Sequence, residues 1–189
     1  RFGPQWEKLG GDIEGDSPLD QFGYDVSLSA NGEIVAIGSF NNNTSGIVKI
    51  FKYDIQDQGG WVQEGNTITT TVSNDRHGHS ISLSGDGSVV AISSFSDSSA
   101  LRETLRIYRN INGTWEKIGN SISREKNQST YLGGSISLSY NGLVVAMGLP
   151  DNDNDHASFN TSSNFGKVFV YEYNSQNNSW EQKGTSIIG

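Results

Sequence analysis

One stretch of the chain decides its fold: Gly23-Tyr-Asp-Val-Ser-Leu-Ser-Ala-Asn-Gly-Glu-Ile-Val-Ala-Ile-Gly38. It returns as Gly78-His-Ser-Ile-Ser-Leu-Ser-Gly-Asp-Gly-Ser-Val-Val-Ala-Ile-Ser93 and as Gly133-Gly-Ser-Ile-Ser-Leu-Ser-Tyr-Asn-Gly-Leu-Val-Val-Ala-Met-Gly148. Four tryptophans recur with the same period, at intervals of about 55 to 65 residues: Trp6, Trp61, Trp115 and Trp180. A repeat of this length predicts an array of identical units, each of them one supersecondary motif.

Each unit is expected to hold four antiparallel strands. In the first unit, Val26–Ser29 alternates apolar and polar residues, and Asn31-Gly32 predicts a type I′ hairpin turn with positive φ at both residues. Ile34–Ile37 is a short β-branched run, typical of a strand buried on both faces, and Ile47–Tyr53 is a third strand. Trp61–Thr69 supplies a fourth strand that fades along its length. Four strands in one such repeat indicate a blade of a β-propeller.

Side-chain size supports a wedge-shaped unit. The first two strands carry small residues, such as Ser27 and Ala36, whereas the last two carry Phe51, Tyr53 and Trp61. Blades converge on a central axis, so their inner strands have room only for small side chains.

We therefore expect an all-β chain that forms a β-propeller segment over residues 1–189. Three blades would cover residues 23–68, 78–122 and 133–188, and residues 6–13 would be the outer strand of a preceding blade. Closed propellers have about four to eight blades, so three blades and one strand cannot close. Open sheet edges also invite pairing. The chain is therefore expected to be part of a larger ring, completed by further blades or subunits.

Composition narrows the possible functions. The net charge of −8 argues against nucleic-acid binding, and the lack of cysteine excludes disulfides, structural zinc and thiol catalysis. The longest apolar run, 143–149, is too short to span a membrane. Six glycosylation sequons lie in expected loops and favour an extracellular or cell-surface location: Asn42, Asn43, Asn112, Asn127, Asn160 and Asn177.

Three motifs carry a resemblance to a known family: Phe22-Gly23-Tyr24, Gly148-Leu-Pro150 after a buried strand, and Gly166-Lys-Val-Phe-Val-Tyr171. They resemble the FG-GAP repeats, best known from the heads of integrin α-subunits. The resemblance spans the chain three times over. It is nearest to degenerate arrays with a Trp-x-x-x-Gly strand, such as Trp6–Gly10, found in secreted or surface proteins of microbes and algae.

The resemblance implies a propeller and leaves the ligand open. The calcium loop of the family lies between the first two strands of a repeat. A tight Asn-Gly or Asp-Gly turn replaces it here, so the resemblance implies no calcium site at those positions.

A separate cation site is predicted at Asp151-Asn-Asp153-Asn-Asp155. Alternating carboxylates suit a cation that prefers oxygen ligands, such as Ca²⁺. The loop lacks the glycine at position six and the glutamate at position twelve of an EF-hand, so a solvated acidic loop is the alternative.

His77 and His79 form a second candidate pair. Residues at i and i+2 share one face of a strand, so the two imidazoles could ligate a metal or respond to pH. The other repeats hold Phe22 and Tyr24, or Leu132 and Gly134, at these positions. We therefore favour packing against a neighbouring blade.

No pattern in the chain indicates catalysis. It has no Ser-His-Asp order, phosphate loop or cofactor fingerprint. Four carboxylates lack a partner histidine or lysine at matching repeat positions: Asp20, Asp25, Glu33 and Asp75. Four tyrosines could form a platform that stacks on sugars, with packing on the outer strands as the alternative: Tyr53, Tyr108, Tyr171 and Tyr173.

We therefore expect no enzyme activity and no cofactor other than Ca²⁺. The expected role is an interaction, adhesion or structural scaffold that binds a protein partner through variable loops at 40–46, 96–103 and 150–165. Three alternatives stay open: a glycan-binding propeller, an assembly subunit of a larger complex or fibre, and the non-catalytic part of a larger enzyme.

Overall fold

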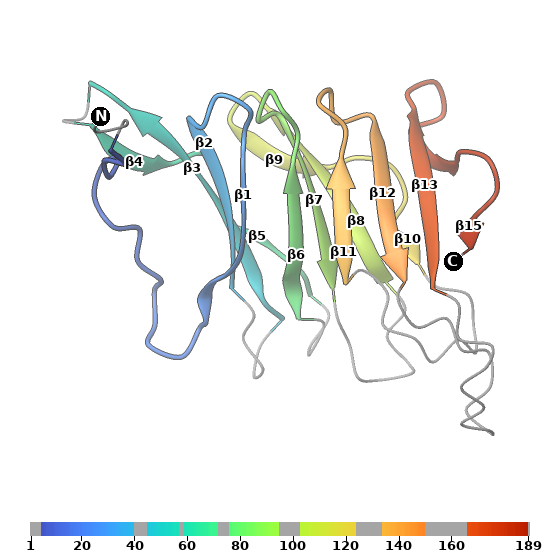
Figure 1. The fold of residues 1–189 in the computed structure, drawn as a ribbon, viewed down its shortest axis with the longest axis horizontal. Helices are drawn as coiled ribbons and strands as arrows, with labels where there is room; N and C mark the ends of the chain where they lie inside the picture. The colour runs from blue at the N-terminus through green and yellow to red at the C-terminus, as the bar shows by residue number, and fades with distance from the viewer. Residues whose placement is uncertain are drawn as a thin grey trace.

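The chain folds into three antiparallel sheets that stand side by side in chain order (Figure 1). The computed structural model describes residues 5–39, 45–56, 59–71, 76–94, 103–123, 134–149 and 166–188. Every regular element within these ranges is a β-strand, so the all-β expectation is confirmed. The described residues contain no helix that could cross a membrane.

The three sheets share one topology. The first contains β1 (Phe22–Leu28), β2 (Ile34–Ser39), β3 (Ile47–Asp54), β4 (Gly60–Gln63) and β5 (Ile68–Thr69). The second contains β6 (His77–Leu83), β7 (Val89–Ser94), β8 (Glu103–Ile111), β9 (Thr114–Lys117) and β10 (Ile122–Ser123). The third contains β11 (Ser135–Leu138), β12 (Val144–Leu149), β13 (Lys167–Asn174), β14 (Ser179–Gln182) and β15 (Ile187–Ile188). The fading fourth strand is thus two short strands that pair with opposite ends of the third strand.

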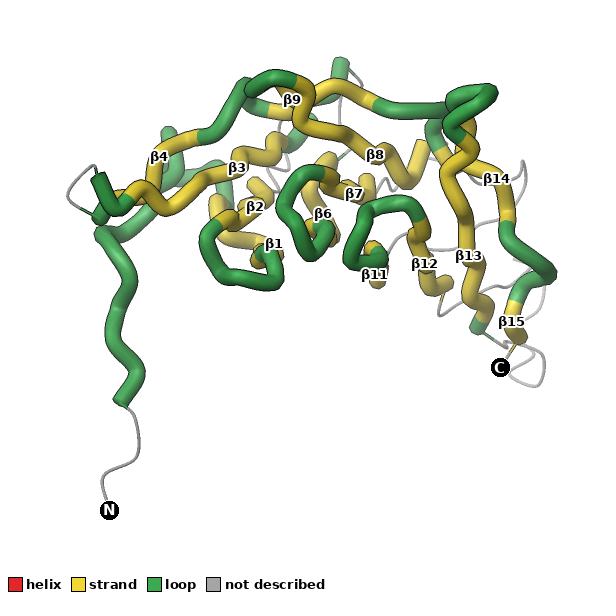
Figure 2. Tube along the Cα trace, turned by 90° about the horizontal axis from the view of Figure 1, so that it is seen from above, coloured by secondary structure: helices red, strands yellow, loops and turns green. Residues whose placement is uncertain are grey.

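The sheets radiate like a sector of a ring. Seen from above, the first strands β1, β6 and β11 lie toward the inside, and β4, β9 and β14 lie toward the outside (Figure 2). The small residues expected on inner strands occupy this inner position, and Ala36 is fully buried. The β2 strand is buried along nearly its whole length, as expected for Ile34–Ile37.

The turn between the first two strands differs from the type I′ prediction. Gly32 has φ +73°, but Asn31 is not among the residues with positive φ. The Gly32 N–H donates to the Ser29 carbonyl, and the Ser29 N–H donates to the Ile34 carbonyl (both 2.9 Å), so the hairpin loop is longer than the two residues of a type I′ turn. The Ser29 hydroxyl accepts from the Ile34 N–H (3.0 Å), and the Asn31 side chain accepts from the Glu33 N–H (3.1 Å). These side-chain bonds hold the backbone in a form that needs glycine at one position only.

The hydrophobic core is divided into two clusters, and each lies between two successive sheets. The first cluster joins Val48 and Ile50 of the first sheet to Val90 and Ile92 of the second. The second cluster joins Leu105 and Ile107 of the second sheet to partners on the third: Val145, Met147, Leu149 and Trp180. The stability of the fold therefore depends on contact between sheets.

Hydrogen bonds repeat across both junctions near the inner strands. The Leu83 N–H donates to Ser27 Oγ, and the Leu138 N–H donates to Ser82 Oγ, each at a distance of 2.9 Å. The Ala30 N–H donates to the Gly85 carbonyl, and the Gly85 N–H donates to the Tyr140 carbonyl, again over 2.9 Å. The repeated serine of the sequence is therefore a link between sheets as well as a small inner residue.

A second repeated contact lies near the outer strands. The Trp115 indole N–H donates to the Glu64 carbonyl (2.9 Å), next to Gly65. The Trp180 indole donates in the same way to the Ile118 carbonyl (3.2 Å), next to Gly119. Each Trp-x-x-x-Gly motif thus supplies a carbonyl and a glycine against which the indole of the next sheet packs.

These glycines give a matched test of the junction. Gly65 (φ +77°) and Gly184 (φ +74°) both have a left-handed backbone, so alanine strains either by roughly 1 to 2 kcal/mol. A Cβ on Gly65 would lie 2.8 Å from the Gly113 carbonyl oxygen, whereas one on Gly184 would meet no atom within 4 Å. We expect Gly65→Ala to cost about 1 to 3 kcal/mol more than Gly184→Ala in urea unfolding. Equal costs would contradict this role of the glycine.

The expected strand over residues 6–13 is not formed. The structure assigns no strand pairing to this segment, because within the described residues no preceding blade offers a third strand with which it could form a ladder. The segment runs along the far side of the first sheet, away from the second (Figures 1 and 2).

Candidate functional site

The face of the first sheet that points away from the second sheet has exposed apolar side chains, whereas the same face of the second sheet is covered by the first sheet. Val26 and Leu28 are 56% and 58% exposed, whereas their repeat equivalents Ile81 and Leu83 are 6% and 5% exposed. The first sheet packs over the second pair, and no sheet among the described residues packs over the first pair. The sequence pattern is the same at both places, so the difference comes from the missing neighbour.

The opposite end of the array is open in the complementary way. Ile68 and Ile122 are 2% and 3% exposed because the next sheet covers them, but the equivalent Ile187 is 62% exposed. Val168 is also partly exposed, although Val48 and Leu105 at the same position are fully buried. Each end of the chain therefore presents one half of the junction that is complete twice inside it.

A buried polar cluster forms the second candidate site, at the edge where β6 begins. Arg106 Nη1 donates to Ser94 Oγ (2.7 Å), and Ser94 Oγ lies 3.1 Å from His77 Nδ1. Arg106 Nη1 is also 3.3 Å from His77 Nδ1, so this nitrogen acts as an acceptor and the ring hydrogen belongs on Nε2. His77, Ser94 and Arg106 are all buried.

Burial, and secondly the positive charge of Arg106, lowers the pKa of His77 from 6.5 to about 3. The ring is therefore neutral at physiological pH and is not a general base exposed to solvent. Tyr108 packs edge-on against it, with ring centroids 6.0 Å apart. The cluster holds the edges of β6, β7 and β8 together.

The first sheet carries a related cluster and the third does not. Lys49, which matches Arg106 in the repeat, is buried and pairs with Asp16 (Nζ to Oδ2, 2.6 Å). The Ser39 hydroxyl, which matches Ser94, donates to the Asp20 carbonyl. Leu149 and Phe169 replace these polar residues in the third sheet. Sequence reasoning missed both buried cations, although Ile47–Tyr53 places a lysine between apolar residues and 105–109 places an arginine likewise.

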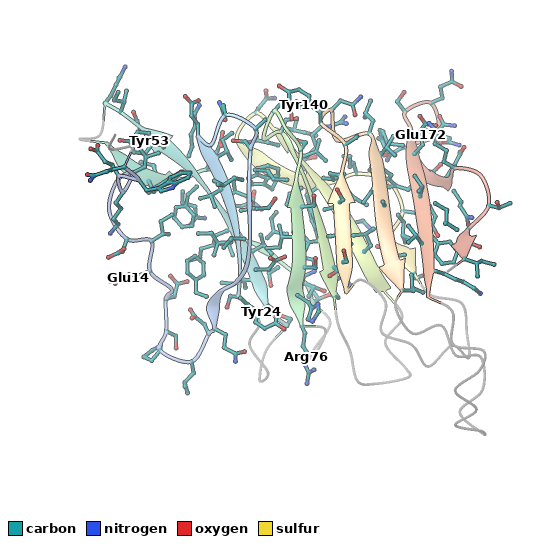
Figure 3. All side chains as sticks on the ribbon, viewed as in Figure 1. Glu14, Tyr24, Tyr53, Arg76, Tyr140 and Glu172 are labelled. Carbon is teal, nitrogen blue, oxygen red and sulfur yellow. The ribbon has the colours of Figure 1, made fainter. Side chains whose placement is uncertain are left out.

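The two histidines do not share a face. A bulge between His77 and Ser80 separates them in the ladder, and Gly78 within it has φ +95°. His79 lies beside Tyr24 of the first sheet, with ring centroids 5.5 Å apart (Figure 3 places Tyr24 at this edge). The bulge invalidates the i, i+2 argument. His79 packs against a neighbouring sheet, and His77 packs within its own.

The remaining candidates hold structure together. Asp25 Oδ2 accepts the Ile81 N–H across the first junction (2.6 Å), and Asp20 Oδ1 accepts the Phe22 N–H (3.2 Å). Among the tyrosines, Tyr108 is buried in the core, while Tyr53 and Tyr173 pack against Trp61 and Trp180 of their own sheets. Within the described residues, no three side chains of His, Asp or Glu gather as a metal site.

Several predicted positions lie outside the described residues. These are Asp75, the candidate calcium ligands Asp151, Asp153 and Asp155, and the sequons Asn42, Asn43, Asn127 and Asn160. The expected binding loops fall largely in the same ranges. Asn112 and Asn177 occupy exposed turns in the second and third sheets. Calcium binding and glycosylation stay predictions.

Comparison with solved structures supports the propeller architecture. Sqt1 from Saccharomyces cerevisiae matches 91% of this chain and 37% of its own, with a TM-score of 0.55 and 15% identity. A putative 6-phosphogluconolactonase from Bacteroides uniformis matches 86% of this chain and 39% of its own, with a TM-score of 0.52 and 22% identity. A second putative 6-phosphogluconolactonase, from Bacteroides fragilis, has a TM-score of 0.50 and 17% identity over 87% of this chain and 38% of its own.

At these identities the likeness shows the fold alone, a partial β-propeller. The chain spans less than two fifths of the length of these three proteins. No protein-family model matches the chain, and no curated protein matches it.

The expectation that the chain has no enzyme activity is wrong, because this fold does not exclude such activity. Two solved proteins with this fold carry the name of a lactonase, so the fold is one in which enzymes occur. The lack of a catalytic pattern in one segment of a ring excludes nothing, because catalytic residues can come from other blades.

Proposed function

We propose that this chain is a scaffold segment of a β-propeller that works by binding protein through its two end faces. The first end face is formed by Val26 and Leu28 of β1, and the last by Val168 of β13 and Ile187 of β15. The partners of these faces are further blades of the same repeat type. Once the ring is complete, the variable segments at 40–46, 96–103 and 150–165 would bind a further protein.

One observation carries the proposal: the end faces repeat the sequence of the buried junctions but are exposed. Leu28 and Leu83 occupy the same repeat position, and only Leu83 is covered. Exposed apolar patches of this kind mark interaction sites. The two faces are unlike each other and complementary, so they form a head-to-tail contact.

The test is sedimentation of the chain over a range of concentrations. We expect association that Leu28→Lys weakens by about tenfold or more, because the lysine would place a charge in an apolar junction. Ile55→Lys is the control, since Ile55 is also apolar and is more exposed than Leu28 but lies in the turn after β3. A chain that stays monomeric at every concentration, or that responds equally to both substitutions, would contradict the proposal.

A further inference from the structure

Residues 8–10 contact the first sheet in the manner of an outer strand from a preceding blade. The Trp61 indole N–H donates to the Leu9 carbonyl over 2.9 Å, and Leu9 precedes Gly10. At the two internal junctions the indole of Trp115 or Trp180 donates to the residue before Gly65 or Gly119. The N-terminal contact is therefore the third copy of one geometry.

The backbone of the segment matches as well. Gly10 has φ +71°, close to +77° at Gly65 and +69° at Gly119. A Cβ on Gly10 would lie 2.9 Å from the Gly59 carbonyl oxygen and 3.1 Å from Trp61 Cδ1. A Cβ on Gly65 would meet the Gly113 carbonyl oxygen and Trp115 Cδ1 at similar distances. The first sheet thus receives residues 8–10 as the second sheet receives residues 63–65.

The inner part of this preceding position is not covered by the segment. In the second sheet, Trp115 and Leu83 are both buried by the first sheet. In the first sheet, Trp61 has its outer-strand contact, but Leu28 remains exposed and Trp6 is fully exposed. The segment lies where the fourth strand of a preceding blade would lie, and the positions of the other three strands beside Leu28 are uncovered.

We propose that this position binds three antiparallel strands of the same repeat, and that residues 5–13 add to them as their fourth strand. The proposal rests on the proposed function, because it names the partner of the first end face. That partner is a blade that lacks its own Trp-x-x-x-Gly strand.

The repeated junctions specify the chemistry of the partner. Its first strand carries a serine whose hydroxyl accepts the Leu28 N–H, as Ser27 accepts the Leu83 N–H. Its turn donates an N–H to the Ala30 carbonyl, as Ala30 donates to the Gly85 carbonyl. Its second and third strands present β-branched residues to Val26 and Leu28, as β2 and β3 do to β6. Its third strand pairs with the backbone around Trp6, as β3 pairs with β4.

The test is an extended chain in which a copy of residues 22–60 replaces residues 1–5. Trp6 then follows the copied Gly60 as Trp61 follows Gly60, and the copy brings no tryptophan of its own. We expect the emission of Trp6 to shift to shorter wavelength as its ring is buried. Trp6→Ala should lower the urea midpoint of the extended chain and leave that of the original chain unchanged.

Leu28→Lys separates this inference from the proposed function. If Leu28→Lys becomes destabilising in the extended chain while Trp6 stays exposed, the copied strands cover β1 without using residues 5–13. That result overturns the inference and keeps the proposed function. If neither residue responds, both are overturned.

A second measurement needs no extension. In the original chain, Gly10→Ala should raise the hydrogen exchange of the Trp61 indole about tenfold or more, because a Cβ at Gly10 displaces Leu9. Gly184→Ala is the control, with the same sign of φ and open space around it. Unchanged exchange in Gly10→Ala would show that the segment is not held as an outer strand and would overturn the inference, even if the extended chain does not fold.

Discussion

Trp115→Ala is expected to lower the free energy of unfolding by about 3 to 5 kcal/mol, as large aromatic deletions in a core do. Trp115 is 3% exposed in the cluster between the first two sheets, and its indole N–H donates across the junction to Glu64. The substitution removes the ring from the cluster and leaves the Glu64 carbonyl without this donor. Urea unfolding followed by circular dichroism measures the change.

Two variants make this result specific. Trp115→Phe keeps a ring but loses the N–H donor, so it should cost less than the alanine variant, by roughly 1 to 2 kcal/mol. Trp6→Ala removes the same residue type from the same motif at a position that is fully exposed, and should change stability by less than about 0.5 kcal/mol. If Trp6→Ala and Trp115→Ala cost the same, the junctions do not stabilise the array.

The second large effect is a loss of stability in acid caused by His77. The pKa of His77 is lowered from 6.5 to about 3 in the folded chain. Between pH 6.5 and about pH 3, the unfolded chain therefore binds a proton at His77 that the folded chain does not bind. The contribution is fully present above pH 6.5 and is lost as the pH falls. Each pH unit below 6.5 costs about 1.4 kcal/mol, or roughly 4 kcal/mol by about pH 3.5.

His77→Phe isolates this contribution from the titration of the carboxylates. Phe22 holds the same position in the first sheet and pairs with Ser39, so the repeat itself tolerates phenylalanine there. We expect the variant to lose less stability than the parent chain between pH 6.5 and pH 3.5, by roughly 4 kcal/mol. Parallel stability curves for the two chains would show that His77 does not resist protonation.

The repeat in the sequence accounts for most of the fold. The alternation in Val26–Ser29 and the β-branched run Ile34–Ile37 predict strands that the structure contains, because periodicity reports which face of a strand is buried. The small-to-large gradient predicts which strands lie inside the arc. These inferences need only the pattern of side chains along one unit.

The errors have local physical causes. The Asn31-Gly32 pair predicts a type I′ turn. This prediction is wrong because the Ser29 hydroxyl binds the Ile34 N–H, which the sequence pattern does not show. The prediction that His77 and His79 share one face of the strand is wrong, because Gly78 allows a bulge that breaks the two-residue period. Arg106 was not expected in a buried cluster, since charged residues are seldom buried unless they have partners, and its partners come from other strands.

The end faces could be inferred only in part from the sequence. The count of blades predicts that the array is open, but it does not say which residues are exposed at each end. The contact of Trp61 with Leu9 depends on the path of the chain before β1, for which residues 6–13 offer only one copy of the motif. The structure adds this path and with it the placement of the segment on the first sheet.

The most direct test of the open-face account compares Leu28→Ala with Leu83→Ala in the same chain. Both leucines occupy the same repeat position, and they differ in exposure only because the first sheet covers Leu83. We expect Leu83→Ala to lower the free energy of unfolding by about 2 to 4 kcal/mol and Leu28→Ala by less than about 0.5 kcal/mol. Equal losses would contradict the claim that the first end face is an unfilled half of a blade junction.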